Sequence, residues 1–159
     1  MNPPWLDIAR KEVGVKETSG PISTKRVLEY HAITSLKATD DSVPWCSAFA
    51  CWCVEQAGFK SPKSARAFDW LKWGIPLDKP QLGCIVVLKR GDRDGHVGFY
   101  EYETDVSIAL LGGNQGDAVN VMKFSKDRII GYRTLQEVLY VPPEPPWRPP
   151  LVWKPGSKT

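Results

Sequence analysis

Three of the four cysteines lie within eight residues of one another, in the stretch PWCSAFACWC that begins at Pro44. Cysteines this close together indicate one of three chemistries: a metal cluster, a disulfide, or one reactive thiol with two bystanders. The sequence also holds two histidines, His31 and His96, and it has no Cys-x-x-Cys pair. The element that carries the cysteines decides among the three.

Residues 46–57 have the apolar spacing of a helix. On such a helix Cys51 and Cys53 point about 200° apart, so they cannot share a metal ion. Cys46 and Cys53 share a face, but about 10.5 Å along the axis separates them, which is too far for a disulfide or one zinc ion. These spacings leave Cys46 as the candidate nucleophile, with Cys51, Cys53 and the strand cysteine Cys84 as packing residues.

Cys46 stands at the expected start of this helix, just after Pro44, a residue type that suits a helix start. A thiol there faces unpaired backbone N–H groups and the positive end of the helix dipole. Both stabilise a thiolate, so we expect a lowered pKa for Cys46. The backbone N–H of Cys46 is also placed to donate to an oxyanion.

A thiol nucleophile needs a base, and histidine has a suitable pKa. In GHVGFYEY the alternation puts Val97 and Phe99 on the core face. His96 and Gly98 then share the other face, where the glycine leaves room beside the imidazole. His31 follows an amphipathic run and is expected to be a surface or packing residue, so His96 is the candidate base.

The second ring nitrogen of such a histidine needs a polar side chain that orients it. The segment SIALLGGNQ places Asn114 at the end of the following strand, on the same face as Leu110 and Gly112. An amide there can hydrogen-bond the ring. A turn asparagine before QGD explains the same spacing, and from the spacing alone both interpretations remain open.

The elements that must position these groups change type along the chain. Helical spacing occurs in residues 4–13, in GPISTKRVLEYHAI, in residues 46–57 and in SARAFDWLKWG. Strand-like alternation follows in GCIVVLKRG, GHVGFYEYE, VSIALLGGN and AVNVMKF…RIIGYRTL, with turns between them. Helices first and an antiparallel meander afterwards predict an α+β domain over residues 1–141.

The composition changes abruptly after this domain. Seven of the 18 residues from 142 to 159 are proline, which predicts a polyproline II tail. A solvated, semi-rigid tail and a tail whose Trp147 and Trp153 dock on the domain or on a partner both fit this composition.

Length and charge limit the function classes. The 159 residues suffice for one domain with a core, and a net charge of +3 is too small to indicate a nucleic-acid partner. No apolar run approaches the roughly 20 residues that span a bilayer. The mixed-charge start MNPPWLDIARKEVG does not have the pattern of a signal peptide. We therefore expect a protein made in a cytoplasm, with reduced cysteines and no membrane partner.

Four motifs spread over about residues 4–134 resemble the CHAP family (cysteine, histidine-dependent amidohydrolase/peptidase), within the papain-like NlpC-type superfamily. They are PWCSAFACWC, WLKWG, GCIVVLKRG…GHVGFY and LLGGNQGDAVNV…GYR. The resemblance is to a subfamily of phage and bacterial proteins. It implies a papain-like fold with N-terminal helices packed on an antiparallel sheet.

The resemblance also implies roles for particular residues. Cys46 matches the family's nucleophile, His96 its general base, and Asn114 its third, polar residue. Many relatives have a glutamate two positions earlier, where this chain has Gly112, so a Cys-His-Asn triad fits better than a set of four. Some CHAP enzymes bind calcium through an acidic loop before the cysteine. Because only Asp40 and Asp41 are acidic there, we expect no structural calcium and no other cofactor.

The function implied by the resemblance is that of a monomeric peptidoglycan hydrolase of the phage endolysin type, which lyses the bacterial cell wall. It would act in the periplasm or wall as an N-acetylmuramoyl-L-alanine amidase or as a peptide endopeptidase. Trp45 and Trp73 are the aromatic candidates for lining its substrate groove. Two alternatives remain: a bacterial toxin, effector or wall-remodelling amidase with the same chemistry, and a catalytically silent wall-binding module.

Overall fold

A computed structural model describes residues 2–18, 23–39, 44–92 and 94–139 of the chain. Two sequence-based expectations fall outside these described residues. One concerns the acidic pair Asp40 and Asp41, and the other concerns the proline-rich tail with Trp147 and Trp153.

The helices of the described residues come first and the strands follow, as the sequence predicts. The helices are α1 (Pro4–Lys11), α2 (Lys25–His31), α3 (Cys46–Gln56) and the 3₁₀ helix η1 (Ala67–Lys72). The strands are β1 (Ile75–Leu77), β2 (Ile85–Lys89), β3 (Gly95–Glu103), β4 (Ser107–Gly112), β5 (Asn120–Ser125) and β6 (Ile129–Thr134), with short 3₁₀ turns η2 (Lys126–Arg128) and η3 (Gln136–Val138). This arrangement confirms the α+β class.

The strands form one antiparallel sheet in the order β1-β6-β2-β3-β4-β5. The hairpins β2–β3, β3–β4 and β4–β5 pair neighbours in sequence, whereas β6 returns to lie between β1 and β2. Phe99 of β3 pairs with Leu111 of β4, so β3 begins at the same end of the sheet at which β4 ends. This end of the sheet therefore brings His96 close to the turn that follows Gly112.

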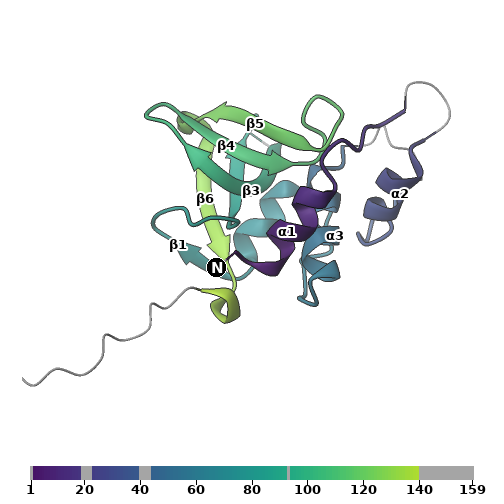
Figure 1. Ribbon diagram of the computed structural model, residues 1–159, viewed down its shortest axis with the longest axis horizontal. Helices are drawn as coiled ribbons and strands as arrows, with labels where there is room; N and C mark the ends of the chain where they lie inside the picture. Colours follow the sequence, from purple (N-terminus) through teal and green to yellow (C-terminus); the bar gives the residue numbers. More distant parts are fainter. Residues whose placement is uncertain (1, 19–22, 40–43, 93, 140–159) are drawn as a thin grey trace, which may run out of the picture.

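Helix α3 is the central helix of the core, and together with α1 it covers one side of the sheet (Figure 1). Almost every residue from Cys46 to Val54 is buried, because the helix is apolar around most of its circumference. Its Phe49 packs edge-on against Phe99 of β3, with ring centroids 6.2 Å apart. This packing fixes the first turn of α3 against the middle of β3.

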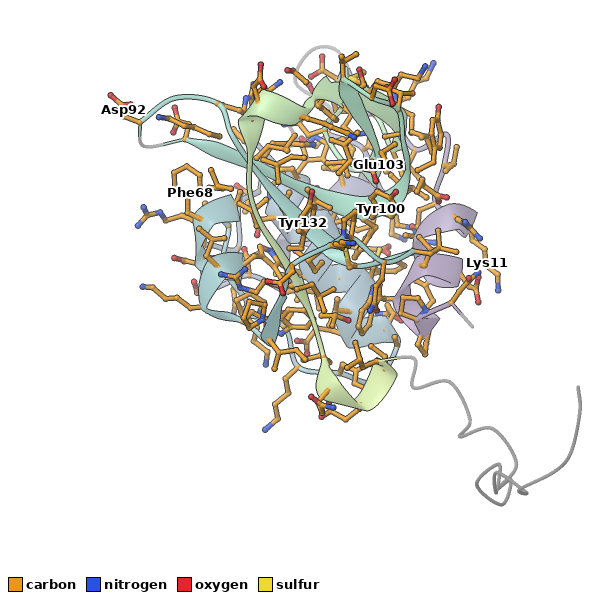
Figure 2. All side chains as sticks on the ribbon, turned by 90° about the vertical axis from the view of Figure 1, so that its left-hand side faces the viewer. Lys11, Phe68, Asp92, Tyr100, Glu103 and Tyr132 are labelled. Atoms are coloured by element: carbon orange, nitrogen blue, oxygen red, sulfur yellow. The ribbon has the colours of Figure 1, made fainter. Side chains whose placement is uncertain are left out.

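The opposite face of the sheet carries a second apolar cluster of Cys84, Val86, Leu88, Ile108 and Leu110. Tyr100 and Tyr132 lie at its margin, and Figure 2 shows them together on this face. The face that carries Gly98 is therefore packed rather than open. A Cβ on Gly98 would lie 3.0 Å from Leu110 Cβ, so the expectation that Gly98 leaves room for a ligand is wrong.

Candidate active site

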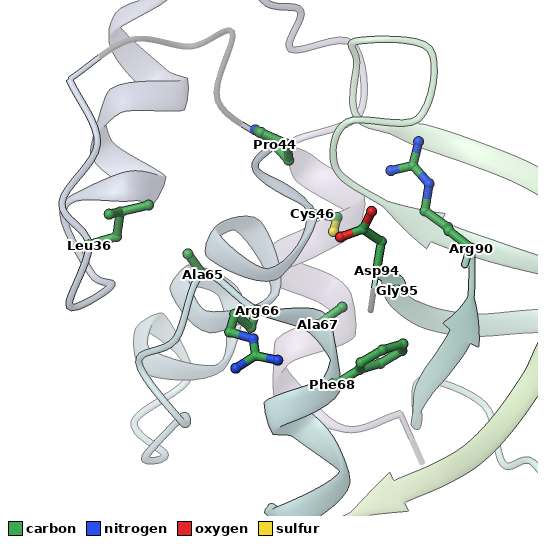
Figure 3. Close-up of a pocket in the computed structure, with 10 residues that line it drawn as sticks. All are labelled: Leu36, Pro44, Cys46, Ala65, Arg66, Ala67, Phe68, Arg90, Asp94 and Gly95. Carbon is green, nitrogen blue, oxygen red and sulfur yellow. The ribbon is translucent and has the colours of Figure 1, made fainter. Parts of the chain in front are cut away.

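Cys46 lines a cleft of about 640 Å³. The residue before it, Trp45, is the N-cap of α3, and Cys46 is the first residue of the helix. The cleft lies between η1 with the loop before it and the β2–β3 hairpin, and Figure 3 shows Cys46 between these two walls. The residue is 5% exposed, so Cys46 is almost entirely buried at the wall of the cleft.

Burial raises the pKa of the Cys46 thiol above its usual value. Hydrogen bonds from the backbone of Val97 and Ser47, and the charge of Arg90, act in the opposite direction but do not reverse the shift. The expected lowering by the helix start is therefore wrong, because desolvation outweighs the backbone N–H groups. Cys46 rests as a neutral thiol at neutral pH.

His96 is the second residue of β3 and is 4% exposed. Burial, together with the charges of Arg90 and Arg128, lowers its pKa to about 4, although the hydrogen bond from its ring to Gln115 raises it. The imidazole is thus neutral at neutral pH and free to accept a proton. Because the backbone of the next residue, Val97, hydrogen-bonds the Cys46 thiol, the base and the thiol lie at the same end of the sheet.

Gln115 holds the imidazole. Its Oε1 lies 2.9 Å from His96 Nε2. The amide nitrogen of Gln115 donates to the carbonyl oxygens of Leu110 (3.1 Å) and Asn120 (2.9 Å), so the amide oxygen must face the ring. An amide oxygen only accepts, so His96 Nε2 carries the hydrogen and Nδ1 keeps its lone pair. Gln115 therefore selects the tautomer whose Nδ1 can take a proton from a thiol.

The contact with His96 expected of Asn114 is made by its neighbour Gln115. Asn114 has a left-handed φ of +57°, and no hydrogen bond joins its side chain to His96 in the described part of the chain. A Cβ at Gly112 would collide with Gln115 Oε1 and lie 3.5 Å from His96 Nε2. Gln115 thus fills the space over Gly112, the position where the resemblance expects a glutamate. A glycine at position 112, in place of a glutamate, is the sequence feature that could have indicated that another side chain contacts His96.

The two tryptophans expected to line the groove belong to the core. Trp45 is 0% exposed, stacks on Tyr30 and donates its indole N–H to Glu17 (3.0 Å). Trp73 donates to the carbonyl oxygen of Lys60 (2.7 Å) and packs edge-on against neighbouring indoles. Neither lines the cleft at Cys46. Phe68, which sequence reasoning missed, is the aromatic residue of that wall.

The remaining thiols and the second histidine are packing residues. All four cysteines are free and buried, and Cys51 Sγ lies 3.7 Å from the carbonyl oxygen of Ser64. His31 is fully buried on α2 rather than on the surface. Among the described residues, no group of three or more His, Cys, Asp or Glu side chains is placed to hold a metal ion. The helices in this part of the chain include none that is long and apolar enough to cross a bilayer.

The low pKa of His96 predicts a loss of stability in acid. In the unfolded chain the imidazole takes up a proton near its usual pKa of 6.5, whereas in the folded chain it does so only near 4. Folding is thus penalised as the pH falls through this interval, by about 3 kcal/mol between pH 7 and pH 4. Urea unfolding of the wild type and of His96→Gln at both pH values measures this loss of unfolding free energy. Equal losses on acidification in the two proteins would contradict the assignment.

Comparison with known proteins places the site within a family. Residues 38–114 match the model of the CHAP domain, and this segment contains Cys46, His96 and Asn114. No curated protein matches the sequence. A crystal structure of a protein similar to a lipoprotein of the NLP/P60 family from Staphylococcus aureus subsp. aureus Mu50 aligns with 18% identity and a TM-score of 0.49. The alignment covers 84% of this chain and 41% of that one, so this chain spans about two fifths of its length. The match over residues 38–114 places this segment in the CHAP domain family of cysteine, histidine-dependent amidohydrolases and peptidases.

Proposed function

We propose that this protein is a peptidoglycan hydrolase that cleaves an amide bond of the bacterial cell wall through a Cys46 thiol. The observation that carries the proposal is the position of Cys46 at the cleft, at the same end of the sheet as a neutral His96 whose tautomer Gln115 selects. The proposed roles are nucleophile for Cys46, general base and acid for His96, and positioning residue for Gln115. The substrate class follows from the activity common to CHAP domains.

The reaction begins from a neutral thiol and a neutral imidazole. As Cys46 Sγ attacks the carbonyl carbon of the substrate amide, its proton passes to His96 Nδ1. The carbonyl oxygen becomes an oxyanion, which the backbone N–H of Cys46 at the start of α3 is proposed to stabilise. The His96 imidazolium then protonates the leaving nitrogen, the C–N bond breaks, and the acyl group remains on sulfur as a thioester.

Water completes the cycle. His96 takes a proton from a water molecule, the hydroxide attacks the thioester carbonyl, and the C–S bond breaks to release a carboxylic acid. The thiolate recovers its proton from His96. Gln115 Oε1 accepts from Nε2 throughout and favours the imidazolium that forms twice in each turnover.

Within this chemistry, we propose that the chain acts as a monomeric phage endolysin that reaches the wall from the host cytoplasm. The bond cleaved is either the N-acetylmuramoyl-L-alanine amide or a peptide bond of the stem or cross-link. Purified peptidoglycan incubated with the full chain, followed by mass spectrometry of the released fragments, tests whether hydrolysis occurs and which bond is cleaved. A new L-alanine amine paired with a muramic lactyl carboxylate would mean amidase, and a new amine inside the peptide would mean endopeptidase. Release of no fragment would contradict the hydrolase proposal.

A further inference from the structure

Two guanidinium groups line the cleft without a carboxylate partner among the described residues. Arg66 precedes η1 and Arg90 follows β2, and Figure 3 shows them on opposite sides of Cys46. The ion pairs of the described residues involve other cations: Arg10, Arg26, Lys89 and Lys126. Both cleft arginines are exposed and therefore available to a ligand.

Arg90 is held close to the reacting groups. Its backbone N–H donates to the carbonyl oxygen of Asp94 (2.9 Å), and that oxygen also accepts from the N–H of Gly91 (3.1 Å). These bonds close the β2–β3 hairpin just before His96. Arg90 lines the same cleft as Cys46, and its charge acts on both the Cys46 thiol and the His96 imidazole, so the guanidinium lies near the place where a scissile amide must bind.

The other residues that line the cleft limit the shape and the charge of a ligand. The Phe68 ring packs on Gly95, where a Cβ would collide with the ring edge, so the ring has a fixed place beside the entry to β3. Leu36 and Pro44 add apolar surface on the other side, and the side chain of Asp94 is the one described carboxylate of the lining. Two cations and one anion in the lining of the cleft match a peptide with more free carboxylates than amines.

We propose that Arg66 and Arg90 bind free carboxylates of the stem peptide near the scissile amide, so that the cleft selects stem peptides whose carboxylates are not amidated. A guanidinium suits this task because it offers paired N–H donors to a carboxylate. A bound carboxylate also neutralises the charge beside His96, which otherwise disfavours the imidazolium of each turnover. The inference rests on the proposed function for its substrate, but it concerns recognition rather than hydrolysis.

Calorimetric binding to the full chain carrying Cys46→Ala tests this selection without turnover. The probes are the synthetic tripeptide N-acetyl-L-Ala-γ-D-Glu-L-Lys with both carboxylates free and the same N-acetylated peptide with both amidated. We expect the free form to bind about tenfold more tightly or better. Adding Arg90→Gln or Arg66→Gln should reduce this preference, and adding both should bring the ratio near one.

Lys89→Gln is the matched control, because it removes the same charge from the neighbouring residue. Lys89 pairs with Asp92 and does not line the cleft, so the preference should persist. Equal affinity for the two peptides, no binding of either, or a preference unchanged by both arginine substitutions would each overturn the inference. Selective binding by a protein whose wild type releases nothing from peptidoglycan would instead overturn the proposed hydrolase and leave the recognition intact.

Discussion

Cys46→Ala is expected to lower the rate of peptidoglycan hydrolysis by about 10⁴-fold or more, while the protein stays folded. The thiol is the nucleophile in the proposed reaction, and alanine offers none in its place. The change removes one small buried atom from the start of α3, so the cost in unfolding free energy should be about 1 kcal/mol. Fragment release from purified peptidoglycan, together with urea unfolding, measures both quantities.

Cys84→Ala provides the matched control, because it also removes one buried thiol. Cys84 lies in the apolar cluster on the far face of the sheet and does not line the cleft. Its substitution should cost a similar amount of stability and leave the rate unchanged. Wild-type hydrolysis by Cys46→Ala would show that the chemistry uses another group.

Gln115→Leu is expected to lower kcat by about 100-fold. Leucine has a similar length, but it leaves His96 Nε2 without an acceptor and the carbonyl oxygens of Leu110 and Asn120 without their donor. The imidazole then loses its fixed tautomer. Each unsatisfied buried group also costs about 1–3 kcal/mol of stability, so rates must be measured well below the unfolding midpoint.

Two further variants distinguish a role of Gln115 in positioning the His96 ring from a general loss of structure. Gln115→Glu places a carboxylate against Nε2 and should raise the pKa of His96, so the acid limb of the rate profile should move to higher pH. Asn114→Gly suits the left-handed φ of +57° and removes the side chain first expected to orient the ring. It should keep nearly full activity. A larger loss with Asn114→Gly than with Gln115→Leu would restore Asn114 as the third residue.

The sequence predicted much of what local periodicity controls. The apolar spacing of α3 and the alternation of β3 placed Cys46 at a helix start and His96 at a strand start, and the structure confirms both positions. It also predicted the order of helices and strands. These features depend on neighbouring residues, so they can be recognised without knowledge of the tertiary fold.

The residues that sequence reasoning misplaced depend on contacts between distant parts of the chain. The alternation of β4 ends at Gly112, and the turn beyond it sends Gln115 rather than Asn114 back to the ring. Trp45 does not line the cleft, because its buried indole donates its N–H to Glu17, a residue of another segment. The pKa of Cys46 rises because the whole fold buries it, which the helix start alone does not reveal.

In the proposed reaction, Cys46 carries the acyl group during hydrolysis. Acid quenching during turnover of a stem peptide, followed by proteolysis and mass spectrometry, tests it directly. We expect a mass increase equal to the acyl half of the substrate on the fragment that contains Cys46, and no such increase in Cys46→Ala. Hydrolysis with the acyl group on a different residue, or hydrolysis that continues unchanged in Cys46→Ala, would contradict it.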